Sequence, residues 1–226
     1  MNARHSFYRD IHKGIRVMLF DLIEKSGRLD VTDAQALAMY RSELTCAIEL
    51  LEDHAHHENE FVAPLLEKAS PELAKLIGGN HVDQEQQLAD LVARLAAIDS
   101  KAADARQQGH AFVVQLSRVV GELLTHMADE EELIMPALWS ILDDAELMKV
   151  HQALVASITP DKFTRSATWM LPAMNRHERL EVLFGVRMTM PAQAFAFVRE
   201  LASSVLSPDD DAALTAALES MALVVA

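Results

Sequence analysis

Two stretches of the chain place a histidine and a glutamate four residues apart, with a proline ten residues after the histidine. They are His54…Glu58…Pro64 and His126…Glu130…Pro136. Both lie in long runs with the apolar periodicity of an α-helix, so the histidine and glutamate of each pair share one helix face. An imidazole nitrogen and a carboxylate that converge on one point form half of a metal site, and two such helices facing each other can build a dinuclear site.

Helical periodicity selects one of the three histidines in the first stretch. His54 and Glu58 share a face with apolar residues, whereas His56 and Glu60, which have the same spacing, are surrounded by acidic residues. We therefore expect His54 and Glu58 to face the core and His56 and Glu60 to form a solvated surface pair.

Four amphipathic helices are expected to carry these residues, at about 5–26, 33–69, 81–98 and 102–141. The third is expected to begin at His81, after a break at 78–80, and to present His81 and Glu85 as a third inward pair. Short connections predict an all-α, up-down-up-down four-helix bundle. Each helix then contributes one inward histidine at the same level of the bundle. These are His12, His54, His81 and His126.

Residues 142–226 differ from the preceding part because prolines separate shorter amphipathic segments, at about 144–157, 162–174, 176–188, 191–206 and 209–224. We interpret residues 1–141 as the bundle with its metal site and residues 142–226 as a C-terminal helical extension. The extension is expected to pack on the bundle or to form a homodimer interface.

Composition argues against several classes of partner. The chain has 20 Lys and Arg against 34 Asp and Glu, a formal charge of −14, which would repel nucleic acid and anionic lipid. No apolar run approaches the length of a membrane span. The single cysteine, Cys46, cannot form an internal disulfide, and the N-terminus lacks the apolar segment of a signal peptide. These features predict a cytoplasmic protein.

Buried carboxylates and imidazoles cost desolvation energy unless they are paired, and a metal cluster would pair them. Seven inward donors exceed what one first-row ion usually takes, so two metals are expected. Nitrogen and oxygen donors suit iron, manganese or zinc, and without further cysteines an iron–sulfur or structural zinc site is disfavoured. The chain contains no Glu-x-x-His, the motif of ferritin-like di-iron bundles.

The sequence resembles the hemerythrin-like (HHE cation-binding) domain family over about residues 5–140. The resemblance rests on His12-Lys-Gly-Ile-Arg16, His54…Glu58…Pro64, His81 and His126…Glu130-Glu131…Pro136. It implies a four-helix bundle with an oxo- or carboxylate-bridged pair of iron ions. By motif position, Glu58 and Glu130 would bridge the ions. His12, His54, His81 and His126 would be terminal ligands.

Glu85 is the place where the sequence departs from the oxygen-carrying members, which the resemblance implies would have a histidine there. A carboxylate ligand adds negative charge, which should stabilise ferric iron and disfavour reversible oxygenation. The resemblance therefore implies a di-iron protein that responds to or reacts with O2, NO or peroxide.

Catalase-like and NO-reducing activities are left open by the sequence. Tyr8, one turn before His12, is the candidate participant besides the metal ligands. Two alternatives also stay open. One is iron storage or handling, and the other is a helical interaction or regulatory protein that uses the scaffold without redox chemistry.

Overall fold

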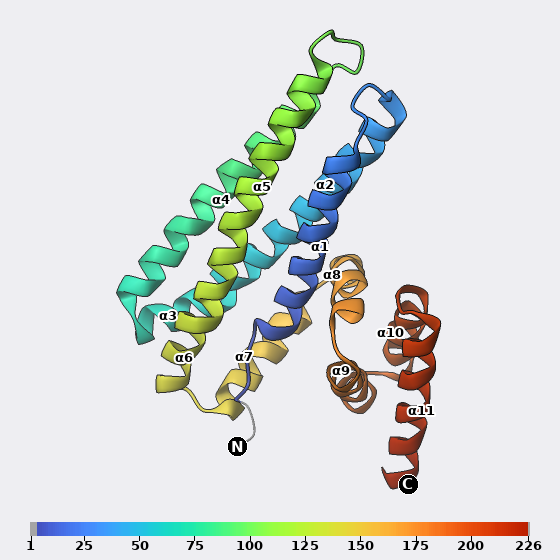
Figure 1. The fold of residues 1–226 in the computed structure, drawn as a ribbon. Coiled ribbons are helices and arrows are strands. Elements are labelled where there is room, and N and C mark those ends of the chain that lie inside the picture. Colours follow the sequence, from blue (N-terminus) through green and yellow to red (C-terminus); the bar gives the residue numbers. More distant parts are fainter. Residues whose placement is uncertain (1–3, 226) are drawn as a thin grey trace. The chain divides into compact units, whose positions relative to one another are not determined.

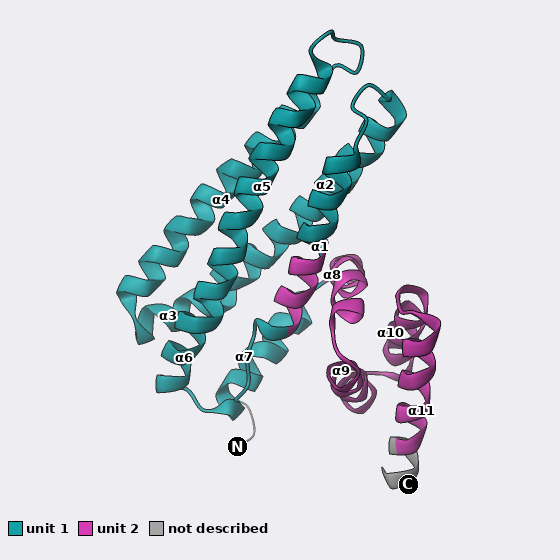
Figure 2. Ribbon diagram, in the orientation of Figure 1, with its two compact units in different colours: residues 1–9, 18–158 teal, residues 10–17, 159–226 magenta. Residues whose placement is uncertain are grey.

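The computed structural model describes residues 4–225 and the side chains of residues 4–220. All its regular elements are helices, and no strand occurs within the described part. The structure divides into two compact units, coloured separately in Figure 2. The first comprises residues 1–9 and 18–158, and the second comprises residues 10–17 and 159–226. The predicted boundary after residue 141 stays a prediction, and each unit is described by itself.

The first unit is built on long helices, as predicted (Figure 1). They are α1 (Arg9–Arg28), whose first half clusters with the second unit, α2 (Ala34–His57), α4 (Pro71–Ala97) and α5 (Ala105–Asp129). Asp33 caps α2 by accepting hydrogen bonds from the backbone N–H groups of Gln35 and Ala36. α4 packs against both α2 and α5.

Two short π-helical segments continue the second and fourth long helices, and each begins at a glutamate of the His-x-x-x-Glu pairs. η1 (Glu58–Val62) leads from α2 into α3 (Ala63–Ala69). η2 (Glu130–Ile134) leads from α5 into α6 (Met135–Ile141). α7 (Asp144–Ser157) completes the unit, and its first turn is held by a capping box between Asp143 and Glu146.

The prediction that the third helix begins at His81 is wrong. α4 begins ten residues earlier, at Pro71, and continues through Gly78 and Gly79. Each glycine inside a helix costs only about 1 kcal/mol relative to alanine. Proline at the first helical position fixes the start, and packing of α4 on α3 with Ile77 buried stabilises the added turns.

The second unit contains α8 (Pro160–Ala173), α9 (Arg176–Thr189), α10 (Ala192–Val205) and α11 (Pro208–Val225). Their bounds lie close to the segments expected from the sequence. They share an apolar core of Ala167, Leu171, Leu183, Val198, Ala202, Leu214 and Leu218. None of the helices within the described residues is long and apolar enough to cross a membrane.

Residues 10–17 of α1 belong to this second unit through close contacts with α8 and α9. Lys13 Nζ lies 2.5 Å from Glu178 Oε1. A Cβ atom on Gly14 would lie 2.9 Å from the backbone nitrogen of Met170, closer than real Cβ atoms approach backbone. Position 14 therefore requires glycine if α1 and α8 are to pack at this distance.

Candidate metal centre

Glu58 and Glu130 are buried, with 6% and 1% of their surfaces exposed, in equivalent positions of the two sequence copies. Each is the first residue of a π-helical segment, and each accepts a hydrogen bond from the backbone N–H five residues later, of Ala63 and Met135 respectively. The carboxylates therefore leave their helices where the backbone is locally widened, a feature frequent at functional sites.

The prolines that close the two sequence motifs explain these π-helical segments. Pro64 and Pro136 stand six residues after the glutamates and lie in the first turns of α3 and α6. Proline has no N–H to donate, and its ring clashes with the carbonyl four residues earlier in a regular α-helix. Widening the helix by one residue removes the clash, so the proline of each copy determines the backbone at the glutamate before it.

One group of candidate ligand atoms lies within the first unit. An atom from each of Glu58, His81, His126 and Glu130 lies within 4.8 Å of the others, and all four residues are buried. His126 Nε2 is 2.9 Å from Glu130 Oε1, and His81 Nε2 is 3.3 Å from Glu58 Oε2. The two Nε2 atoms are 3.1 Å apart. Helices α4 and α5 thus direct one imidazole each between two carboxylates.

Asn59 fixes the orientation of the His81 ring. The Nδ1–H of His81 donates a hydrogen bond of 2.9 Å to Asn59 Oδ1, because a carbonyl oxygen only accepts. This contact directs Nε2 toward the carboxylates.

Burial alone would lower the pKa of His81. Hydrogen bonding to Glu130 and Glu58, together with their negative charges, outweighs burial and raises the pKa to about 9.

Tyr8 lies beside the same two carboxylates. Its side chain is buried, and its pKa is raised well above the ordinary value, first by burial and then by the negative charges of Glu58 and Glu130. The phenol therefore stays protonated at neutral pH and is able to donate a hydrogen bond. Tyr8 also belongs to an apolar cluster with Val62, Leu66, Ile77, Ile134, Met135, Leu138 and Leu147.

His54 approaches the two carboxylates independently of His81 and His126. Candidate ligand atoms of His54, Glu58 and Glu130 lie within 4.8 Å of one another. The His54 side chain is 15% exposed, and its Nε2 is 3.4 Å from Glu58 Oε1. His56 and Glu60 form the expected surface pair at 3.5 Å, with side chains 67% and 53% exposed.

His12 lies in the part of α1 that clusters with the second unit and is fully buried. Its assignment as a ligand stays a prediction.

The structure does not bring Glu85 to the cluster. Its side chain is exposed, so the expectation that it faces inward with His81 is wrong. The buried stripe of α4 runs through Ile77, His81 and Leu88. Gln84, three residues after His81, lies closer to that stripe and is half-buried. The inference against oxygen carriage, which required Glu85 as a ligand, therefore has no support here.

Comparison with known families gives a match to the hemerythrin HHE cation binding domain over residues 5–138. The chain belongs to this family. Comparisons with curated proteins and with solved structures found no match. The matched residues include both π-helical segments and every ligand candidate named above.

The residues of this hemerythrin-like domain fit a metal centre by their chemistry. Lone-pair donors of two kinds, imidazole nitrogen and carboxylate oxygen, converge at buried positions, and these donors suit first-row metals. Two imidazole nitrogens 3.1 Å apart share at most one hydrogen bond, whereas a cation would bind both lone pairs. His126 Nδ1 is buried without a hydrogen-bond partner among the described residues.

Asn59 and the π-helical segments were not predicted from the sequence. The proline six residues after each glutamate was a usable signal for the segments. Nothing in the His-x-x-x-Glu spacing indicates the residue after the glutamate. The contact of Asn59 with His81 requires knowledge of how α4 packs on α2 and α3, which flank η1.

Proposed function

We propose that this hemerythrin-like protein binds two metal ions, iron in the first place, with manganese or zinc compatible with the same donors. The observation that carries the proposal is that Glu58 and Glu130 belong to two groups of donors, one with His54 and one with His81 and His126. Two carboxylates, each with two oxygens, suit a bridging role between neighbouring ions. A single ion would leave one of these groups without a function.

We assign His12 to the position beside His54. Tyr8 and His12 stand four residues apart at the start of α1, so their side chains share one helix face. Tyr8 lies beside Glu58 and Glu130, and His12 is fully buried. We therefore expect the buried imidazole of His12, one turn after Tyr8, to supply a second nitrogen ligand, besides that of His54, to the same metal ion.

The proposed physiological function is a response to, or reaction with, O2, NO or peroxide. When bound, two iron ions would supply redox chemistry toward such small molecules. The protein contributes a neutral phenol at Tyr8, which can donate a hydrogen bond beside the carboxylates. The apolar cluster that includes Tyr8, Val62 and Ile134 limits the entry of water and larger solutes.

Exposure of the iron-loaded, oxygen-free protein to O2, NO and hydrogen peroxide in turn tests this function. The proposal predicts a change in the iron absorption spectrum with at least one of them. Tyr8→Phe should keep the iron but alter the rate or the final spectrum. A spectrum that none of the three changes would reject redox chemistry and favour a storage or scaffold role. If Tyr8→Phe lowered the iron content but changed neither the rate nor the final spectrum, the role given to the phenol would be rejected.

A further inference from the structure

The second unit contains a cavity of about 340 Å³ between α9 and α11, formed within this unit alone. It is lined by Arg176, His177, Arg179, Leu180, Asp210, Ala213, Leu214 and Ala217. Its volume falls in the range of small-molecule sites. The metal centre uses none of these residues.

Arg179 is the buried charge of this cavity, with 6% of its surface exposed. Its Nε–H donates to the carbonyl of Leu171 at 2.8 Å, and an Nη2–H donates to the carbonyl of Pro172 at 3.3 Å. These contacts hold the guanidinium with Nη1 directed at Asp210 Oδ1, 3.2 Å away. That pair attracts by charge but lacks hydrogen-bond geometry, so Nη1 is buried without a hydrogen-bond acceptor among the described residues.

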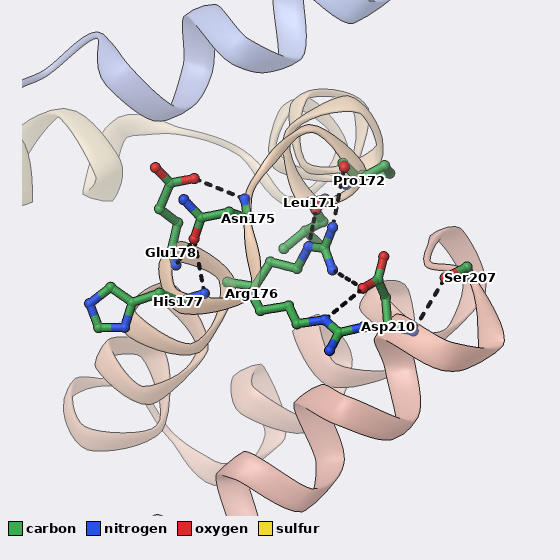
Figure 3. Close-up of polar contacts among 9 residues, drawn as sticks. Leu171, Pro172, Asn175, Arg176, His177, Glu178, Ser207 and Asp210 are labelled. Carbon is green, nitrogen blue, oxygen red and sulfur yellow. Dashed lines mark hydrogen bonds and ion pairs between the residues drawn. The ribbon is translucent and has the colours of Figure 1, made fainter.

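Arg176 supplies a second positive charge to the same carboxylate (Figure 3). Its Nε lies 3.3 Å from the same Asp210 oxygen, and its side chain is 70% exposed at the rim. The pKa of Asp210 is lowered first by its close contact with the Arg179 guanidinium and then by Arg176, so Asp210 is ionised at neutral pH. Among the residues that line the cavity, two guanidinium groups and one carboxylate leave one net positive charge. The neighbouring Asp211 does not neutralise it, because Arg199 binds Asp211 at 2.7 Å.

The remaining wall is apolar and comes from Leu180 on α9 and from Ala213, Leu214 and Ala217 on α11. The small side chains at 213 and 217 leave room that leucine or phenylalanine would fill. A net positive rim above an apolar wall is suited to a ligand with an anionic head and a short apolar body.

We propose that this cavity binds a small amphiphilic anion, a carboxylate or phosphate monoester with a short apolar chain. The head would pair with Arg176 and with Nη1 of Arg179, sharing both guanidinium groups with Asp210, and the chain would lie against Ala213, Leu214 and Ala217. The chain as a whole has a formal charge of −14, and this pair of arginines, one of them buried, differs from those negative surroundings by offering positive charge to an anion.

The experiment is calorimetric titration of the full-length protein with hexanoate and hexyl phosphate, with hexanol and hexylammonium as probes of the same chain without an anionic head. We expect saturable binding of one or both anions with a Kd below about 1 mM, and at least tenfold weaker binding of the two other probes. Comparing the two anions shows whether a carboxylate or a phosphate is preferred.

Variants at the rim and the wall test the assignment without removing buried Arg179. Arg176→Gln and Ala213→Leu should each weaken anion binding about tenfold or more. Arg187→Gln removes an exposed charge from the same helix and should leave binding unchanged, with thermal unfolding as the check on folding. Absence of saturable anion binding, equal binding of hexanol, or equal weakening by Arg187→Gln would each overturn the proposal.

Discussion

His81 Nε2 and His126 Nε2 face each other at 3.1 Å, although their residues stand 45 positions apart on α4 and α5. Both atoms also approach Glu130 Oε1, at 3.6 and 2.9 Å. Two imidazoles in this arrangement are ready to bind one cation beside a carboxylate.

The first prediction follows from this pair. His81→Ala and His126→Ala should each lower the metal content from two ions to one per chain, because the group with His54 keeps its donors. Glu58→Gln and Glu130→Gln should lose both ions, since each carboxylate serves both groups. Metal analysis after gel filtration measures this. Retention of two ions in Glu130→Gln would contradict the bridging role.

A second prediction separates two pairs of identical spacing. His54→Ala should remove one metal ion, because His54 lies within 4.8 Å of both buried carboxylates. His56→Ala is the matched control, since His56 has the same spacing but pairs with Glu60 at the exposed surface. Its metal content and thermal stability should match those of the unaltered protein. Equal loss in the two variants would mean that the inward face of α2 is wrongly assigned.

Asn59 provides a third prediction. Asn59→Ala removes the acceptor that orients His81 and should weaken metal binding about 10- to 100-fold while the fold is retained. Glu60→Gln, at the next and exposed position, is the control. Competition with a chelator of known affinity gives the metal dissociation constant of each protein. A dissociation constant of Asn59→Ala equal to that of the unaltered protein would show that the ring is held by other contacts.

The pKa of His81 gives a fourth prediction for the metal-free protein. Because the folded pKa, about 9, lies above the ordinary value of 6.5, protonated His81 stabilises the fold fully below pH 6.5. This contribution is lost as the pH rises through about 9. The unfolding free energy should therefore fall between pH 6.5 and 9.5, by up to about 3 kcal/mol from this group.

Chemical denaturation of the metal-free protein at several pH values measures this fall. His81→Gln is the control, because glutamine does not titrate and the part of the fall due to His81 should disappear. The same pH dependence in both proteins would contradict the assignment.

The sequence indicated the fold well where apolar periodicity and prolines determine it. The inward faces of His54, His81 and His126, and the bounds of the C-terminal helices, follow from such patterns. Glu85 shows the limit of this reasoning. Four residues rotate a helix by about 40° beyond a full turn. A residue that shares a face with His81 by spacing can therefore still lie outside the buried stripe, and the neighbouring helices decide the outcome.

The start of α4 and the role of Asn59 depend on tertiary packing. Gly78 and Gly79 favour a break locally, but burial of Ile77 and packing on α3 favour a continuous helix. Asn59 meets His81 because α2 and α3, which flank η1, both pack on α4. Neither outcome is contained in a local pattern of residues.

Metal analysis of the full chain, purified without oxygen and loaded with iron(II), shows whether the protein holds two metal ions. We expect two iron ions per chain, removed only slowly by a chelator, and a fall in thermal stability once they are removed. A protein that retains no metal and has the same unfolding temperature before and after chelation would rule out the proposed metal centre.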